Sequence, residues 1–469
     1  MVFAEIRSLA LRRFGVSLSV VLLSYIYLLI LSPGELSIVF ICASVGQVLR
    51  VLCRMGANGR LMTKRCSPTD KEYSVAFSLM LVATFFVLCV SVPFLYGVSF
   101  VFGAGSLFWP GVMSLLLLPI HVFSLPASSQ LERGLNVGIV SSVEARSQMI
   151  GSSVAVILVI LGVGARGVII GWIVRDFFYL VGIYRYSPRF PRFCWSWPYA
   201  RRLIWFGCGY TTAIALNQCR MLVLLLMTNL LFGQEVAGYV GLSHKMLGFF
   251  SPIGSSVSRV MLPVFVLLSE GDGSRKFLEN LSAKELLAAI PVAIGSVLVL
   301  DIAVNFLDPK WKVLMHYYPW VAAGSIIASA YGLGMTALHA KGDFSGSAWI
   351  SVVVIVATVV AVMISRLFGD DYAALASVLI WPGFFYQGYR VSKVFKNYFD
   401  IYIVIWIVAG ILGCLHPFYG YHLLLISMAI LVSTAPGIIT ALKCDVESLL
   451  PSRCFVKYQV GRGRSSGRA

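Results

Sequence analysis

The sequence contains little charge. Asp, Glu, Lys and Arg make up 12% of its 469 residues, whereas 59% are hydrophobic and the mean hydropathy is +0.87. Soluble domains carry roughly 25% charged residues, so this composition predicts an all-α, polytopic membrane protein. Acidic residues are fewer than basic residues, and the formal net charge is +17. The basic residues fall mostly in short loops on alternate sides of the apolar segments. Membrane topology therefore explains them, and we expect no nucleic-acid partner.

Motifs for catalysis and metal binding are also missing. The ten cysteines include no Cys-x-x-Cys pair, so neither a disulfide framework nor a metal site is indicated. Gly162-Val163-Gly164 and Gly207-Cys208-Gly209 lack the preceding strand that a phosphate-binding glycine loop needs. His121 and the other histidines show no metal-ligand spacing and are interpreted as packing or interface residues. We find no nucleophile triad, and we predict no enzymatic activity, no catalytic residue, no metal and no cofactor.

Long apolar runs are abundant. About fourteen segments reach the ~20 residues that cross a bilayer. Even-numbered connections and both ends of the chain are rich in Lys and Arg, which predicts an inner-membrane protein with both termini in the cytoplasm. Prolines interrupt two of the segments, 106–127 and 315–338. The predicted segments are 14–32, 36–56, 73–99, 106–127, 138–163, 167–184, 203–231, 236–266, 284–305, 315–338, 345–366, 372–389, 399–415 and 420–442.

Two turns on the outer side share a pattern. The first reads Leu31-Ser32-Pro33-Gly34-Glu35 and the second reads Leu231-Phe232-Gly233-Gln234-Glu235. Ser32 and Glu35 have the spacing of a capping box, and proline suits the first position of a helix. The first turn is therefore predicted to start a helix directly after Ser32.

A second pair of motifs has nearly the same offset. Phe177-Phe178-Tyr179 and Phe384-Phe385-Tyr386 each lie near the inner end of a predicted span. Both pairs indicate a repeat of about 200 residues, which is long enough for six spans in each half. We expect a six-helix lobe at 1–200, a second six-helix lobe related by a pseudo-two-fold repeat at 201–397, a further helix pair at 398–442, and a basic cytoplasmic tail at 443–469.

Cations occur where the pattern predicts membrane depth. Arg220 lies in segment 203–231, and Lys245 and Arg259 lie in segment 236–266. A cation at the centre of a spanning helix costs roughly 2.5–3.5 kcal/mol, and such residues usually face a water-filled cavity. A cavity lined by cations would suit an anionic passenger.

Small residues share one face with two of these cations. This stripe can be the wall of a cavity, or a seam of close helix packing with Arg259 reaching the inner interface. Both interpretations stay open. The stripe consists of Gly238, Gly241, Lys245, Gly248, Pro252, Ser255 and Arg259.

Four more cations lie in predicted spans of the first lobe. Arg50 and Arg54 are one turn apart near the inner end of their span, where interface anchoring is the alternative to substrate contact. Arg146 is close to Glu144, and Arg175 precedes Asp176. Local ion pairs and cavity-facing groups are equally consistent with these positions.

The deep carboxylates are few. Asp301 and Asp176 are candidates for a proton-coupled step, which needs a carboxylate with a raised pKa, but pairing with a deep arginine is the favoured role. Either one can be the partner of Arg220, which shares a helical face with Asn217.

These motifs resemble those of the Wzx-type polysaccharide transporters, which are lipid-linked oligosaccharide flippases of the multidrug/oligosaccharidyl-lipid/polysaccharide exporter superfamily. The resemblance implies two six-helix lobes around a central cavity, alternating access, and a polyprenyl-diphosphate-linked glycan as passenger. The first predicted span departs from many members because it has no deep arginine, so headgroup contacts on that side fall to Arg50 or Arg54. The motifs are Leu31–Glu35, the lobe start Arg201-Arg202-Leu203-Ile204-Trp205-Phe206-Gly207, the turn Leu231–Tyr239, and Pro263-Val264-Phe265.

The sequence hypothesis is therefore transport without covalent chemistry. Arg220 and Lys245, with Arg259 and the cations of the first lobe, neutralise the diphosphate of a lipid-linked oligosaccharide. The expected partners are this substrate, the membrane and other polysaccharide-assembly proteins. A multidrug-type cation antiporter on the same fold would need carboxylates exposed in the cavity. A glycan polymerase or ligase is a further alternative, but the outer connections here are short.

Overall fold

The computed structural model describes residue 26 and residues 30–57, 69–101, 105–133, 136–187, 190–247, 272–306, 309–379, 381–395, 401–419, 424–428 and 430–431. Within these ranges the chain is helical and contains no strand, as predicted. The α-helices are α2 (Pro33–Arg54), α4 (Asp70–Val101), α5 (Gly105–Leu115), α6 (Leu117–Arg133), α7 (Val137–Ile160), α8 (Ala165–Tyr184), α9 (Trp197–Phe232), α10 (Gln234–Leu247), α12 (Asp272–Ala303), α13 (Leu314–Ala340), α14 (Phe344–Phe368), α15 (Trp381–Phe395), α16 (Ile401–Cys414) and α17 (His416–Tyr419). Three 3₁₀ helices are η1 (Val304–Phe306), η2 (Pro309–Trp311) and η3 (Asp370–Ser377).

The start of α2 has the predicted cap. The backbone N–H of Glu35 donates to the Ser32 hydroxyl at 3.3 Å, and the Ser32 N–H donates to the Glu35 carboxylate at 3.1 Å. Pro33 occupies the first turn, where its missing N–H costs nothing. The helix ends at Met55, whose φ of 46° is left-handed. The capping box read from the sequence is therefore confirmed.

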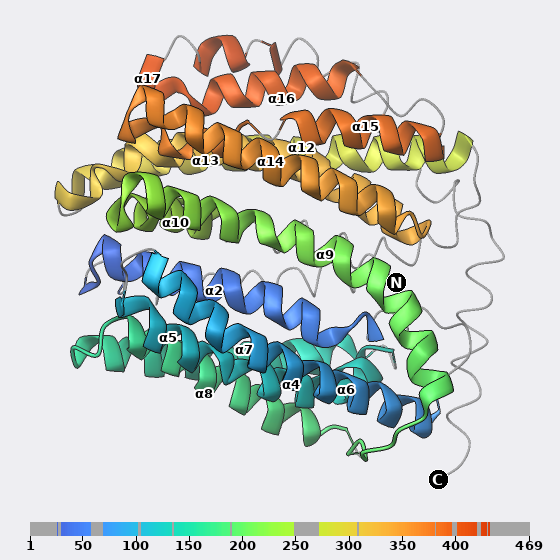
Figure 1. The fold of residues 1–469 in the computed structure, drawn as a ribbon. Coiled ribbons are helices and arrows are strands. Elements are labelled where there is room, and N and C mark those ends of the chain that lie inside the picture. The colour runs from blue at the N-terminus through green and yellow to red at the C-terminus, as the bar shows by residue number, and fades with distance from the viewer. Residues whose placement is uncertain are drawn as a thin grey trace.

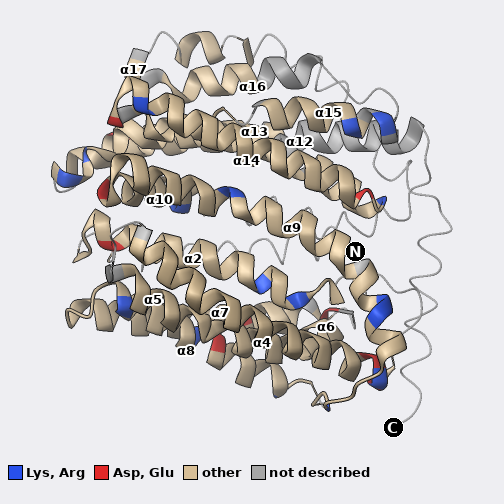
Figure 2. Cartoon of the chain, in the orientation of Figure 1, with Lys and Arg blue, Asp and Glu red and all other residues tan. Residues whose placement is uncertain are grey.

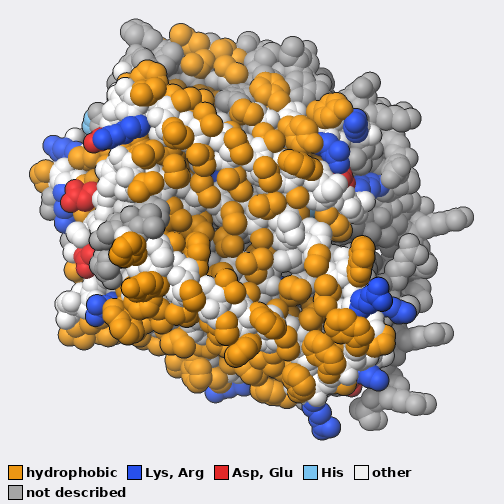
Figure 3. All heavy atoms as spheres, viewed as in Figure 1, with side chains coloured by type: hydrophobic (Ala, Val, Ile, Leu, Met, Phe, Trp, Pro, Cys, Tyr) orange, Lys and Arg blue, Asp and Glu red, His pale blue; other side chains and the backbone are white. Residues whose placement is uncertain are grey.

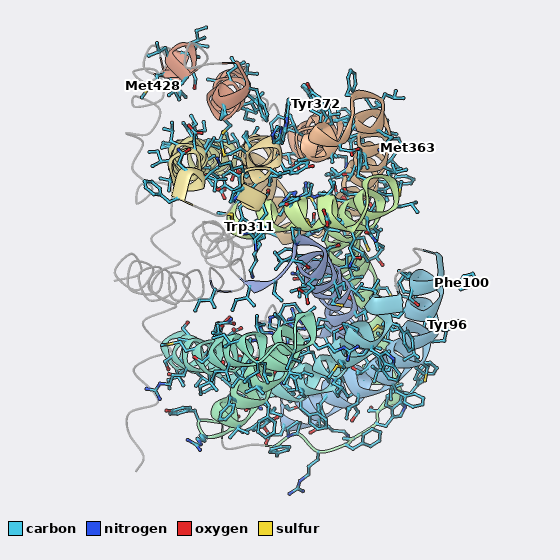
Figure 4. The ribbon with its side chains drawn as sticks, turned by 90° about the vertical axis from the view of Figure 1, so that its left-hand side faces the viewer. Tyr96, Phe100, Trp311, Met363, Tyr372 and Met428 are labelled. Carbon is cyan, nitrogen blue, oxygen red and sulfur yellow. The ribbon has the colours of Figure 1, made fainter. Side chains whose placement is uncertain are left out.

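The helices make a protein that crosses the membrane several times. In the described part of the chain, nine segments are long and apolar enough to span a bilayer. Hydrophobic side chains cover the middle of the face in Figure 3, and charged ones gather toward its two edges. Tyr96 and Phe100 extend outward from α4 (Figure 4) and are 64% and 80% exposed. The predicted count of fourteen stays a prediction, because parts of the first, eighth and last segments lie outside the described residues.

Two predicted spans that contain prolines are confirmed as segments able to cross a membrane, and one predicted span needs correction. Segment 106–127 corresponds to the span Leu107–Glu132, in which the helix breaks at Leu116, between α5 and α6. Segment 315–338 is one continuous helix, α13, that contains Pro319. Segment 372–389 is divided into η3 and α15 instead of forming one α-helix. Pro319 lies inside α13 without ending it, so a proline in the sequence does not by itself locate a helix break.

The helices form two groups that meet along α2. Figure 1 shows α2 and α4–α8 on one side and α10 and α12–α17 on the other, with α9 running between them. Helix α2 packs against both α9 and α10. The two turns with similar sequence adjoin one another, since the Gln234 side-chain amide donates to the carbonyl oxygen of Gly34 at 3.0 Å. The equivalent helices of the two predicted lobes therefore pair with each other.

Glycine makes this pairing close. A side chain at Gly238 would overlap the backbone of Pro33, and one at Gly241 would overlap the Phe40 ring. These two members of the stripe form a packing seam, so the cavity-wall interpretation does not apply to them. At the other end of α2, Gly207 of α9 lies directly against Met55. Lobe contacts thus occur at both ends of α2.

Candidate functional site

One carboxylate organises the cations of the first helix group. Asp176 on α8 accepts a hydrogen bond from Arg50 of α2 at 3.0 Å and one from its neighbour Arg175 at 2.7 Å. The side chain of Arg50 is 23% exposed, that of Arg175 is 22% exposed and that of Asp176 is 12% exposed. Gln148 of α7 accepts a weaker bond from Arg175 at 3.4 Å. Asp176 therefore pairs with arginine, the favoured expectation for it, but its partners are Arg50 and Arg175.

Arg54 lies one turn further along α2 and contacts a histidine. Its Nη2 lies 2.7 Å from Nε2 of His121 on α6, and its Nε lies 3.2 Å from the same atom. A guanidinium group can only donate hydrogen bonds, so His121 Nε2 must accept. The imidazole is therefore neutral, with its proton on Nδ1, and it helps to hold the Arg54 guanidinium in place.

The second helix group contributes Lys245. This residue lies eleven positions after Gln234, the start of α10, or about 16 Å along the helix axis and near the middle of a ~30 Å hydrocarbon core. Protein surrounds its ammonium group on most sides, yet the side chain is solvent-accessible. Lys245 is also within electrostatic range of Arg175, so a cation of each helix group lies near the other.

We call Arg50, Arg54, Arg175 and Lys245 the cation cluster, in which Arg175 is within electrostatic range of Lys245 and Arg54 is within range of Arg50. With Asp176 included, its formal charge is four positive and one negative. Figure 2 shows basic segments on α2, α9 and α10 in the interior of the bundle as well as at its edges. The buried Nε of Arg50 has no hydrogen-bond partner in the described part of the chain. Surplus charge and an unused donor make the cluster suited to a multivalent oxyanion, which accepts charge-assisted hydrogen bonds from several sides.

Some predicted site residues lie elsewhere. Arg220 is half-buried on α9 and within electrostatic range of His244, whose Nε2 is 3.0 Å from the Ser377 hydroxyl. Asn217 is exposed on the same helix. Arg220 therefore lies in a polar region of the second helix group. Arg146 is exposed on α7.

Two other candidates are not part of the described cluster. Asp301 lies in the last turn of α12, where its backbone carbonyl accepts from Asn305 at 3.2 Å. It is therefore nearer to the end of its span than the sequence suggested. Arg259, together with Gly248, Pro252 and Ser255 of the stripe, lies outside the described residues.

Sequence reasoning missed two residues beside the cluster. His121 was interpreted as a packing or interface residue, and Tyr210 of α9 was not considered. Tyr210 is within electrostatic range of Arg54, across the contact between α2 and α9. His121 follows Pro119 inside an apolar segment, a signal that could have drawn attention to it. Tyr210 offers no such signal, because its relation to Arg54 arises only from packing.

The sequence matches the model of one protein family. The family model described as "Polysaccharide biosynthesis protein" matches residues 29–316. Comparison with curated protein sequences gives no match.

Several solved structures have a similar fold. The lipid II flippase MurJ in an inward closed conformation is 13% identical, with 91% of this chain and 97% of that one covered and a TM-score of 0.62. A eukaryotic MATE transporter is 14% identical, with 84% and 95% covered and a TM-score of 0.56. A multidrug/oligosaccharidyl-lipid/polysaccharide exporter (MOP) superfamily transporter from Pyrococcus furiosus, described as having a binding pocket of reverse polarity, is 12% identical, with 83% and 97% covered and a TM-score of 0.51.

Proposed function

Because this chain belongs to the polysaccharide biosynthesis protein family, we propose that it moves a polyprenyl-diphosphate-linked oligosaccharide across the cytoplasmic membrane. The observation that carries the proposal is the cation cluster. Its members come from both helix groups, and its positive charge exceeds that of its one carboxylate. A diphosphate is the part of such a substrate that most needs compensation inside a membrane.

The proposed mechanism requires no covalent step. Arg54 and Lys245 pair with the diphosphate, and Arg50 and Arg175 extend the same positive region. Asp176 positions the latter two arginines and keeps them apart. The sugars occupy the accessible space beside the cluster, while the prenyl chain stays in lipid between the lobes. The lobes, which we place at 1–200 and 201–397, then rock and expose the headgroup on the other side.

The rival functions fit the site less well. A multidrug-type antiporter would require a carboxylate that is available to a cation, but Asp176 is engaged by two arginines. Arg220, Asn217, Arg146 and Arg259 remain candidate contacts with other parts of the substrate, and Asp301 remains a candidate coupling group. We further propose cytoplasmic termini, an inner-membrane location, and contact with other polysaccharide-assembly proteins.

The cluster can be tested with the double variant Arg54→Gln/Lys245→Gln. Each charge-assisted hydrogen bond contributes ~1.5–3 kcal/mol, so loss of both cations should weaken binding of undecaprenyl diphosphate about a hundredfold or more. In cells, lipid-linked glycan should accumulate on the cytoplasmic side. Binding to the purified protein and glycan export are the measurements.

Arg366→Gln is the matched control. Arg366 forms an exposed ion pair with Asp370 at 2.9 Å, far from the cluster in sequence and at a helix end. Its loss should leave both measurements unchanged, since exposed pairs contribute little. Normal export by the double variant would refute the proposed function.

A further inference from the structure

Three rings gather next to the cation cluster at one end of the second helix group. Tyr210 of α9 packs edge-to-face against Phe344, the first residue of α14, with ring centroids 5.7 Å apart. The ring of His339, in the last turn of α13, lies 5.8 Å from Tyr210 and 6.2 Å from Phe344. All three side chains are half-buried, so each keeps part of its surface accessible. We call these three residues the aromatic cluster.

The local sequence brings the rings together. Gly209 precedes Tyr210, and a side chain there would meet the Phe344 ring at about van der Waals distance, so α9 and the start of α14 lie close. His339 is held by the Ser347 hydroxyl, 2.7 Å from its Nε2. The rings are therefore fixed in place by their own helices before any ligand arrives, which lowers the entropic cost of binding to them.

The aromatic cluster adjoins the phosphate-binding part of the proposed site. The charge of Arg54 on α2 acts on the Tyr210 hydroxyl of α9. Three residues before Tyr210, Gly207 lies against Met55, which follows Arg54 directly. A ligand whose anionic group contacts Arg54 would therefore place its next chemical unit beside Tyr210.

A sugar ring suits this position. The faces of a pyranose carry apolar C–H groups, which pack on aromatic rings, and its rim carries hydroxyls, which need hydrogen-bond partners such as a tyrosine hydroxyl. We infer that Tyr210, Phe344 and His339 form a subsite for the sugar directly attached to the diphosphate. This inference rests on the proposed function and adds to it the group that recognises the glycan.

The test compares two probes on the full-length protein in detergent: undecaprenyl diphosphate, and undecaprenyl-diphosphoryl-N-acetylglucosamine. Tyr210→Ala should weaken binding of the sugar-bearing probe about tenfold, the scale of one lost aromatic contact, with affinity for the bare diphosphate unchanged. Phe344→Ala should act in the same direction. Unchanged binding of the bare lipid also shows that the variant is folded.

Trp349→Ala is the matched control, because Trp349 lies on α14 one and a half turns beyond Phe344 and is 62% exposed. It should bind both probes like the native protein. Equal weakening of both probes by Tyr210→Ala, or no weakening of either, would overturn the sugar subsite alone. Failure of the native protein to bind either probe would instead overturn the proposed function and the subsite with it.

Discussion

Asp176 is the residue on which the geometry of the first-lobe cations depends. It is the acceptor shared by Arg50 and Arg175, and its side chain is 12% exposed. Without it, two neighbouring guanidinium groups would repel each other in a region that water reaches only in part. The single carboxylate thus lets an excess of positive charge exist at membrane depth, which is the property that an anionic passenger needs.

Asp176→Asn should therefore destabilise the protein and increase its response to anions. Breaking a buried pair costs about 3–5 kcal/mol, and partial exposure reduces this to about 2 kcal/mol. The apparent melting temperature in detergent should fall, and inorganic diphosphate should restore more of it than in the native protein, because a bound anion stabilises the state that binds it.

The exposed Asp370→Asn is the control for this substitution. Asp370 is 59% exposed and pairs with Arg366, so its loss should leave the melting temperature nearly unchanged. If Asp176→Asn melted at the native temperature, or if diphosphate stabilised both proteins equally, Asp176 would not be positioning the arginines.

The helix pair α2 and α10 carries the contact between the lobes at one end. Gly34 accepts from Gln234, and Gly238 leaves the space that the Pro33 backbone fills. Small residues let helix backbones approach closely, and in a membrane this packing is the main source of attraction between helices. At its first two glycines the stripe is therefore the seam that joins α10 to α2, not a cavity wall.

Gly238→Ala should separate the two helices. Its new methyl group would collide with backbone, which cannot rotate away, so we expect a loss of about 1–3 kcal/mol. Thermal unfolding in detergent is the measurement. Gly295→Ala, at a helical glycine of α12 with nothing within 4 Å, should be neutral or stabilising because alanine favours helix. Equal melting temperatures for the two variants would contradict the close approach.

At the scale of the whole molecule, the helix order separates two exposed cations. Arg192 precedes the start of α9, at the end opposite to the α9–α10 turn, whereas Lys312 lies near that turn because Tyr239 of α10 donates to the Lys310 carbonyl at 2.9 Å. The positive-inside rule then predicts that Arg192 faces the cytoplasm and Lys312 faces outward. Both side chains are exposed, so both positions can report on orientation.

Cysteine labelling tests this orientation. In intact cells a membrane-impermeant maleimide should label Lys312→Cys above the background of the ten native cysteines and should not label Arg192→Cys. After the cells are broken, both should react. Labelling of Arg192→Cys in intact cells, with Lys312→Cys protected, would reverse the topology and the proposed direction of transport.

The sequence by itself determined the features that depend on local chemistry and on hydropathy. The capping box at Ser32, the turn between helices at Gly233 and the assignment to multi-pass membrane proteins all follow from residue type and spacing, which act over a few positions. The repeat of the turns also predicted that α2 and α10 are equivalent.

Only the tertiary structure decided which cations meet. Arg50, Arg175 and Lys245 are separated by up to 195 positions (245 − 50) in the sequence. Arg220 is also a cation within a predicted span, yet it lies near His244. The role of His121 as an acceptor for Arg54, and the position of Tyr210 beside it, depend on how α2, α6 and α9 pack. Periodicity fixes the face of one helix, but the rotation and depth of that helix against its neighbours are set by side-chain packing between distant segments.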